Sequence, residues 1–235
     1  SRLRAWGLTF LRFLVTWEAI EHAGPGIYDQ DYLDYLYAVV KKAGEYDLNL
    51  FIDPHQDVWS RYTGGDGAPG WTLEAVGFDL TRLHATGAAF LHQEHGDPFP
   101  RMIWSTNYNK LAAATMFTLF FAGNDFAPQL KIEGVPVQEY LQSHYIQAIQ
   151  QVALKLKDLP NVVGYDTLNE PSRGYIGEKN INQYATAVPA LMGEFPTIFQ
   201  SMLLGNGFDQ TVDVYKLGLT SFKKVGSRVI NAQRV

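Results

Sequence analysis

The chain has 235 residues, of which 46% are hydrophobic, 14% aromatic and 18% charged. This is the composition of a globular protein, and it excludes a disordered, collagen-like or coiled-coil chain. The 19 Lys and Arg residues against 24 Asp and Glu leave a formal charge of −5 without basic clusters, which excludes nucleic acid as an expected partner. Because there is no Cys, a disulfide scaffold, a Cys-ligated zinc site and thiol catalysis are also excluded.

The first seven residues, SRLRAWG, are typical of a helix end closed by Gly7. They do not have the apolar core and small-residue cleavage site of a signal peptide. No Asn-x-Ser/Thr glycosylation sequon occurs in the chain, so we expect an intracellular protein, either cytoplasmic or vacuolar. The longest apolar run, residues 111–122, is about half of the roughly 20 residues that span a bilayer. At most a transient contact with a membrane surface is therefore expected.

Three segments, residues 10–17, 48–52 and 161–165, have the apolar, β-branched and aromatic composition of buried strands. Such near-continuous apolar runs favour a parallel sheet that is covered on both faces. Apolar residues at helical spacing predict helices over residues 30–46 and 137–156. Strands that alternate with helices in this way indicate an α/β fold with right-handed connections.

Residues 58–134 interrupt this alternation after the second predicted strand. A connection of this length far exceeds the usual few residues, so we expect a partly helical lid or cleft wall. Its apolar stretch, residues 111–122, fits either a lipid-facing lid helix or a buried helix, and the buried helix is favoured. Near the end, alternation over residues 211–215 and the apolar residues of 228–230 predict a hairpin. Since a (β/α)8 barrel needs eight strands, the three predicted parallel strands belong to a small open domain or to part of a larger barrel.

Each predicted parallel strand ends in a polar cluster. The clusters are TWE at residues 16–18, DPHQD at residues 53–57 and DTLNEP at residues 166–171. In α/β sheets and barrels the active site is built at the carboxyl ends of the strands, so the clusters predict one shared site. The alternative is that these are ordinary exposed loops, which are polar by default.

The residue types within the clusters indicate chemistry on sugars. A partly desolvated Glu, such as Glu170 in Asn-Glu-Pro, can protonate the oxygen of a leaving group. The neighbouring Asn169 can donate a hydrogen bond to a sugar 2-hydroxyl, which strengthens at an oxocarbenium-like transition state. His55 and Asp57 lie two residues apart and so project to the same side of an extended chain, where they can hold adjacent hydroxyls. An ion pair at the rim, or a His that caps a loop, explains the same pair without function.

Four strings make the sequence recognisable: FLRFLVTWEAIEHAGPG, FIDPHQDVWSR, GGDGAPGWTLEAVGFD and TLNEPSRGYIG. They resemble glycoside hydrolase family 5, and most closely its endoglycoceramidase-like branch with the fungal glucosylceramidases and steryl-β-glucosidases. The resemblance extends over most of the chain, including GEFPTIFQSMLLGNG and the closing VIN.

The resemblance implies a (β/α)8 TIM barrel and a retaining mechanism with two Glu residues. On this basis Glu170 is the acid/base, Asn169 is the 2-hydroxyl partner and Arg12 holds the carboxylate of the nucleophile. His55 and Asp57 match residues that line the subsite for the terminal glucose. Arg12 could also be an ordinary salt-bridged core residue. Trp71 could stack on a sugar or on the aglycone, but an ordinary packing role is equally open.

Mapped on this family, the α/β chain carries strands two to four of the barrel, with the long insertion after strand three. Residues 1–235 are then a partial catalytic barrel domain in which 58–134 is a lid-like insertion. The remaining barrel strands, and with them the nucleophile, are expected outside this sequence. The expected activity is hydrolysis of the β-glucosidic bond of a glycolipid, either a sterylglucoside or glucosylceramide. A β-glucan hydrolase, or a non-catalytic glycoside-binding module if the chain is whole, are the alternatives.

Two further motifs are rejected, and no cofactor and no metal are expected. GDGAPG at residues 65–70 matches G-x-G-x-x-G, but no strand leads into it and Pro69 disfavours the start of a helix, so we expect a loop. HQEH at residues 92–95 does not have the spacing of a zinc protease motif, and a solvated helix end is expected there instead.

Overall fold

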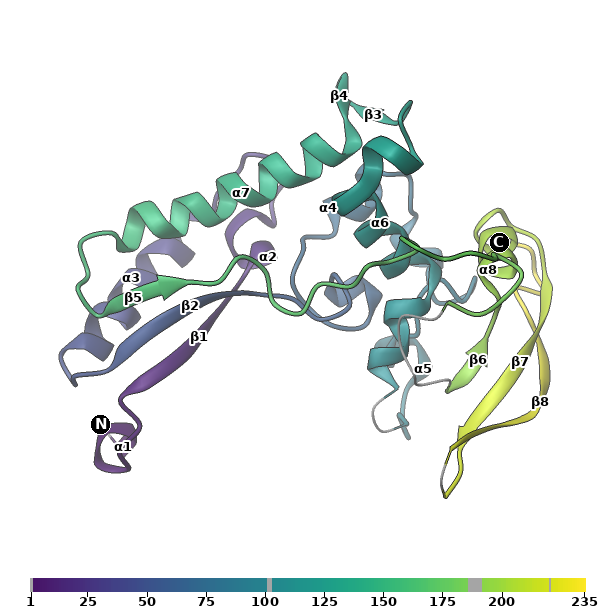
Figure 1. The fold of residues 1–235 in the computed structure, drawn as a ribbon, viewed down its shortest axis with the longest axis horizontal. Helices are drawn as coiled ribbons and strands as arrows, with labels where there is room; N and C mark the ends of the chain where they lie inside the picture. The colour runs from purple at the N-terminus through teal and green to yellow at the C-terminus, as the bar shows by residue number, and fades with distance from the viewer. Residues whose placement is uncertain (1, 101–102, 186–191, 220) are drawn as a thin grey trace.

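The computed structural model describes residues 2–100, 103–185, 192–219 and 221–235, and Figure 1 shows an elongated molecule with a sheet at each end. At the N-terminal end, after the short helix α1 (Arg2–Ala5), strands β1 (Phe10–Thr16), β2 (Asn49–His55) and β5 (Val162–Tyr165) form a parallel sheet in the order β1-β2-β5. The three predicted strands and their parallel arrangement are thus confirmed.

Two long helices cover one face of this sheet (Figure 1). They are α3 (Gln30–Gly44), whose N-cap Asp29 accepts a hydrogen bond from Tyr32 N, and α7 (Val137–Leu156). Each buries an apolar stripe at helical spacing, so both predicted helices are confirmed. Together with β1, β2 and a third helix, α6 (Leu111–Phe126), they build one hydrophobic core.

The opposite face of the sheet is open in the described residues. Large apolar side chains are exposed on it, including Phe10 at 61%, Leu14 at 49% and Val163 at 52%. The prediction of a sheet covered on both faces is therefore wrong for the described part of the chain. Apolar composition shows that a strand face needs cover, but it does not show which segment supplies that cover.

The first strand ends one residue earlier than predicted, because Trp17 begins the short helix α2 (Trp17–Glu21). Thr16 is the N-cap of that helix, and its hydroxyl accepts a hydrogen bond from Ala19 N at 3.2 Å. Trp17 has a composition that favours a strand, but the N-cap bond of Thr16 stabilises the start of a helix at this point. The second strand, in contrast, continues three residues beyond its prediction, to His55.

The long segment between β2 and α7 is partly helical, as predicted. Its helices and strands, in chain order, are η1 (Arg61–Thr63), α4 (Trp71–Ala75), η2 (Leu80–Arg82), α5 (His92–His95), η3 (Trp104–Asn109), α6 (Leu111–Phe126), β3 (Lys131–Ile132) and β4 (Val135–Pro136). Most residues of α6 are buried, which confirms the buried-helix interpretation. Residues 65–70 form a loop up to the start of α4, as expected for the rejected glycine motif.

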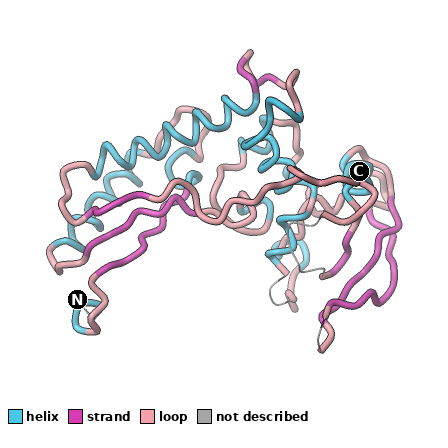
Figure 2. The backbone as a smooth tube through the Cα atoms, in the orientation of Figure 1, coloured by secondary structure: helices cyan, strands magenta, loops and turns pink. Residues whose placement is uncertain are grey.

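The second sheet lies at the other end of the molecule and is antiparallel (Figures 1 and 2). It consists of β6 (Gly193–Phe195), β7 (Gln210–Leu217) and β8 (Phe222–Ile230), with helix α8 (Ile198–Gly205) between the first two. Strands β7 and β8 pair in antiparallel register, which confirms the predicted hairpin. No helix in the described part of the chain combines the length and apolarity needed to cross a bilayer.

Candidate active site

The guanidinium of Arg12 joins the carboxyl ends of the three parallel strands. Its Nη2 lies 2.7 Å from Asp53 Oδ2, donates a hydrogen bond to Asn169 Oδ1 and lies 3.4 Å from His55 Nδ1. Arg12 is on β1, Asp53 and His55 are on β2, and Asn169 follows β5. Parallel pairing therefore brings side chains up to 157 positions apart into one polar group. We call Arg12, Asp53, His55, Asp57 and Asn169 the strand-end cluster.

Asp53 provides the buried negative charge of the strand-end cluster. Its side chain is completely buried, and its Oδ2 is shared by Arg12 and by His55 Nδ1 at 3.0 Å. Its Oδ1 is also buried and has no hydrogen-bond partner among the described residues. Because an unpaired buried carboxylate is strongly destabilising, Arg12 stabilises this residue through a charge-assisted contact. This geometry fits both interpretations of Arg12: a residue that holds the carboxylate of the nucleophile, and an ordinary salt-bridged residue.

His55 also faces Asp57, with 3.4 Å between His55 Nε2 and Asp57 Oδ2. The prediction that these side chains project to the same side is confirmed, although an ion pair would show the same contact. Asp57 forms an isolated antiparallel bridge with Asp66, and burial of Asp66 raises the pKa of that carboxyl. The carboxylates of Asp57 and Asp53 raise it further, while His55 opposes the shift.

The side chains of His55, Asp57 and Asp66 each offer a ligand atom, and these atoms lie within 4.8 Å of one another. Such a set has the chemistry to hold a divalent cation. The same atoms have the chemistry to bind the adjacent hydroxyls of a sugar, and His55 Nδ1 already contacts Asp53. That the protein uses no metal stays a prediction.

Glu170 follows Asn169 in a backbone conformation that is unusual for a residue with a side chain. Its φ is 40°, in the left-handed region, which costs about 1–2 kcal/mol for a residue other than Gly. The contacts that hold the segment include a bond from Asn169 N to the Pro54 carbonyl and one from the Gln56 side chain to the Glu170 carbonyl, both 3.0 Å long. The residue is exposed, so the partial desolvation invoked from the sequence is not present in the described residues.

Aromatic rings pack beside the strand-end cluster. Trp17 lies at the start of α2, with its ring centroid 5.5 Å from those of Trp71 and Tyr145 and 6.2 Å from that of Trp59. Trp17 and His55 both line a small hollow. The surroundings of Trp71 fit an ordinary packing role, because its indole N–H donates to the Glu21 carbonyl at 2.8 Å. Stacking of Trp71 on a substrate stays a prediction.

Two buried residues of the site were not singled out from the sequence. Asp53 shares its spacing of two with His55 and Asp57, so strand alternation would have placed all three on one face. Gln56 is 3% exposed and bonds to the segment that carries Glu170. No signal in the sequence distinguishes it from any other polar residue after a strand.

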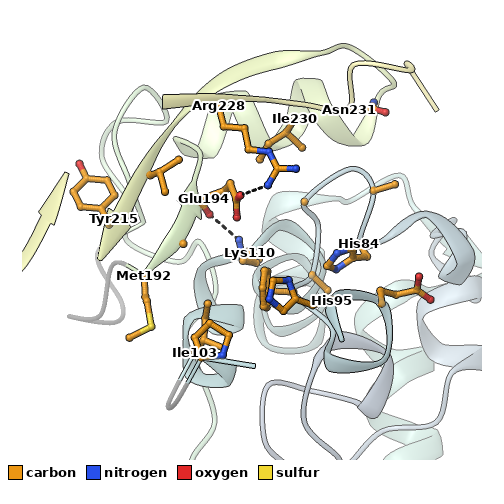
Figure 3. A pocket seen from close by; sticks show the side chains of 18 of the residues that line it. His84, His95, Ile103, Lys110, Met192, Glu194, Tyr215, Arg228, Ile230 and Asn231 are labelled. Atoms are coloured by element: carbon orange, nitrogen blue, oxygen red, sulfur yellow. Dashed lines mark hydrogen bonds and ion pairs between the residues drawn. The ribbon is translucent and has the colours of Figure 1, made fainter. Parts of the chain in front are cut away.

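A larger cavity of about 780 Å³ lies between the long insertion and the antiparallel sheet (Figure 3). Lys110 donates a hydrogen bond to the Glu194 carbonyl at 3.0 Å, and the carboxylate of Glu194 pairs with Arg228 at 2.8 Å. In the described part of the chain, neither Glu170 nor any member of the strand-end cluster lines this cavity. It is therefore separate from the candidate active site.

The family of the chain follows from comparison with known proteins. A family model described as cellulase (glycosyl hydrolase family 5) matches residues 1–192. The chain belongs to glycosyl hydrolase family 5. The resemblance stated from the sequence is thereby confirmed, and the parallel sheet with its helices is part of a (β/α)8 TIM barrel.

Similar members of family 5 match almost the whole chain. A glucosylceramidase from Rhizopus delemar is 48% identical over 238 residues, and an ergosteryl-β-glucosidase from Saccharomyces cerevisiae is 41% identical over 251 residues. These alignments cover 100% and 98% of this chain, but 35% and 33% of the relatives. A crystal structure of Cryptococcus neoformans sterylglucosidase 1 is 42% identical, with a TM-score of 0.94, and the match covers 100% of this chain and 34% of that one. The chain thus spans about a third of the length of these family 5 relatives.

Replacing Asp53, the buried carboxylate of the strand-end cluster, by Ala is expected to lower the stability of the protein. Removing the buried carboxylate leaves Arg12 and His55 without their shared partner. Because the Arg12 side chain is half exposed and can be solvated, we expect the free energy of unfolding to fall by about 1–3 kcal/mol. Urea unfolding measures this loss. The matched control is Asp34→Ala, which removes an exposed carboxylate that pairs with Lys155 and should cost much less. Equal losses in the two variants would show that the strand-end cluster does not stabilise the fold.

Proposed function

We propose that the protein containing this chain is a retaining β-glucosidase that cleaves the glucosidic bond of a glycolipid, either a sterylglucoside or glucosylceramide. One observation carries the proposal: Arg12 ties the ends of three barrel strands together beside the Asn169–Glu170 pair. The similarity of the whole chain to proteins named glucosylceramidase and ergosteryl-β-glucosidase supports the substrate class.

Glu170 acts first as an acid and then as a base. In the first step, the carboxylate of a nucleophile attacks the anomeric carbon, the bond to the aglycone oxygen breaks and Glu170 donates its proton to that oxygen. In the second step, Glu170 takes a proton from water, which attacks the anomeric carbon and releases the nucleophile and β-glucose. The exposure of Glu170 leaves its carboxyl accessible to a substrate.

Among the described residues, Asn169 and Arg12 each keep donors that suit their proposed roles. The carboxamide of Asn169 accepts from Arg12 and donates one N–H to the Gln56 carbonyl at 3.1 Å. Its second N–H is the donor for the sugar 2-hydroxyl. Arg12 has five N–H donors in a planar fork, so it can also hold the carboxylate of the nucleophile beside Asp53. His55 and Asp57 bind the remaining hydroxyls of the glucose.

The nucleophile and the other barrel strands lie outside residues 1–235 in this proposal, with the nucleophile about 5 Å from the Glu170 carboxyl, as retention requires. The chain then contributes barrel strands two to four. Residues 58–134 form the insertion after strand three and act as a lid or cleft wall, from which Trp71 could reach the sugar or the aglycone. Contact with a membrane surface is at most transient, and an intracellular location, cytoplasmic or vacuolar, stays a prediction.

A β-glucan hydrolase is the second candidate, because the matching family model is described as cellulase. Glucose release by the complete protein separates the candidates when ergosteryl β-glucoside, glucosylceramide and a cello-oligosaccharide are compared. We expect release from at least one of the lipids, with β-glucose as the first anomer seen by NMR. Hydrolysis of the oligosaccharide alone would favour the second candidate, and α-glucose as the first anomer would exclude retention. Binding without hydrolysis would indicate a non-catalytic module.

A further inference from the structure

Gln56 lies at the centre of the site but is not one of the residues assigned above to the chemistry. It follows the last residue of β2, between His55 and Asp57, and its side chain points away from solvent with the residue only 3% exposed. A buried carboxamide is costly unless its donors and acceptor find partners. The partners of Gln56 therefore indicate why this side chain is there.

The carboxamide of Gln56 bonds to two consecutive carbonyls of the segment that carries the acid/base. Its Nε2 donates to the Asn169 carbonyl at 2.7 Å and to the Glu170 carbonyl at 3.0 Å. Its Oε1 accepts from Trp59 N at 3.0 Å. Both N–H donors and the carbonyl oxygen of this side chain thus have partners. One donor binds Asn169 and the other binds the next residue, Glu170.

A reciprocal contact closes this arrangement. The side chain of Asn169 donates to the main-chain carbonyl of Gln56 at 3.1 Å, and Asn169 N donates to the main-chain carbonyl of Pro54 at 3.0 Å. The end of β2 and the Asn169–Glu170 segment are therefore held together by main-chain and side-chain bonds in both directions. The side chain of Tyr145 adds a contact from α7, with its hydroxyl donating to the Thr167 carbonyl at 2.5 Å.

The side chain of Gln56 is itself held by close packing. A Cβ on Gly67 would lie 2.4 Å from Gln56 Cβ and 2.8 Å from the Trp59 carbonyl, so only Gly fits against it. Gly67 has a φ of 122°, which also favours Gly. Packing at Cβ and hydrogen bonds at the carboxamide thus hold the side chain at both ends, as a rigid support for another residue requires.

We propose that Gln56 is the positioning residue of the acid/base, holding Glu170 in its left-handed conformation so that its carboxyl reaches the oxygen of the leaving group. The assignment rests on the proposed function. At a φ of 40°, and before Pro171, Glu170 has a backbone that local preferences disfavour, so contacts from outside the segment must hold it. The bond from Gln56 to the Glu170 carbonyl is such a contact. Without it, the segment relaxes and the carboxyl moves away from the scissile bond.

The test is Gln56→Met in the complete protein, which keeps the length of the side chain and removes its hydrogen bonds. Two substrates are compared by kcat/KM: octyl β-glucoside, whose leaving group needs a proton, and 2,4-dinitrophenyl β-glucoside, whose leaving group does not. We expect kcat/KM for the octyl glucoside to fall about 10- to 100-fold, as for a displaced catalytic group. For the dinitrophenyl glucoside it should fall less than about threefold, because proton donation is not needed there.

The matched control is Gln142→Met on α7, which also removes a glutamine bond to a main-chain carbonyl, that of Phe120 at 2.7 Å. It should change kcat/KM of the two substrates little and equally. If Gln56→Met does not give folded protein by circular dichroism, Gln56→Asn decides, because it keeps the carboxamide but is too short to reach both carbonyls. It should show the same selective loss to a smaller degree.

Each result has one meaning. Equal losses for the two substrates in a folded Gln56 variant, or no loss for either, would overturn the positioning role while leaving the glucosidase intact. If the unmodified protein hydrolyses neither glucoside, and neither of the two lipid glucosides, the proposed function fails and the assignment fails with it.

Discussion

Replacing Glu170 by Gln is expected to lower kcat/KM for a sterylglucoside or glucosylceramide by about 100- to 10,000-fold, the usual contribution of a general acid/base. Gln keeps the shape of the side chain but can neither donate the proton in the first step nor accept one in the second. Gln56 donates to the main-chain carbonyls of Asn169 and Glu170, and Asn169 N donates to the Pro54 carbonyl. None of these bonds uses the Glu170 side chain, so they persist in the variant. Steady-state release of glucose measures the loss.

Two further measurements separate a lost acid/base from a damaged fold. A glucoside with a good leaving group, such as 2,4-dinitrophenyl β-glucoside, should still form the glucosyl-enzyme, because no proton is needed there. Azide, which needs no base to attack, should then restore turnover and give β-glucosyl azide. The control Glu45→Gln, at the end of α3 next to Lys42, should behave as the unmodified protein. Unchanged hydrolysis of the lipid glucosides in Glu170→Gln would refute the assignment.

Replacing Lys110 by Met is expected to stabilise the protein near neutral pH. Lys110 is 3% exposed, and its ammonium group donates to the Glu194 carbonyl at 3.0 Å (Figure 3). The Phe195 ring centroid lies 5.8 Å from the same group. Burial lowers its pKa from the usual 10.5 to about 8, although the Glu194 carboxylate opposes this. The difference corresponds to about 3 kcal/mol of destabilisation while Lys110 is charged. The lost hydrogen bond offsets about 1 kcal/mol of the gain.

The sign of the pH dependence follows from the lowered pKa of Lys110. Between about pH 8 and the usual value of 10.5, the unfolded chain binds more protons at this residue than the folded chain does. The contribution of Lys110 to stability therefore rises with pH across that interval. Below about pH 8 both states are protonated and the penalty is present in full. The advantage of Lys110→Met should consequently be largest near pH 7 and disappear by about pH 10.

Urea unfolding at about pH 7 and about pH 10 measures this advantage as a difference between variant and parent, which cancels the titration of other groups. Lys224→Met on β8 is the control, because the pKa of Lys224 is shifted in the opposite direction from that of Lys110. The exposed Lys224 pairs with Asp213 at 2.6 Å, which raises its pKa, so this variant should be no more stable than the parent at pH 7. A Lys110→Met protein that is less stable than its parent at both pH values would contradict the prediction.

Local patterns determined the helices and strands that could be predicted. The apolar stripes of α3 and α7, the strand compositions of β1, β2 and β5, and the β7–β8 alternation each lie within about 20 consecutive residues, so the sequence shows them directly. The same holds for the polar residues after the strands. Because parallel strands end at one edge, these residues were expected to meet before their contacts were known.

Tertiary structure alone decided which of those polar residues are buried and what they bind. Asp53 and Gln56 look like other polar residues after a strand, yet one is the buried ion-pair partner of Arg12 and the other supports Glu170. Likewise, the sequence left stacking on a substrate and ordinary packing both open for Trp71, and the structure packs its indole against Trp17 and the Glu21 carbonyl. These features depend on contacts between segments up to 157 positions apart. Burial and hydrogen bonding across such separations arise only when the elements pack, so no local pattern encodes them.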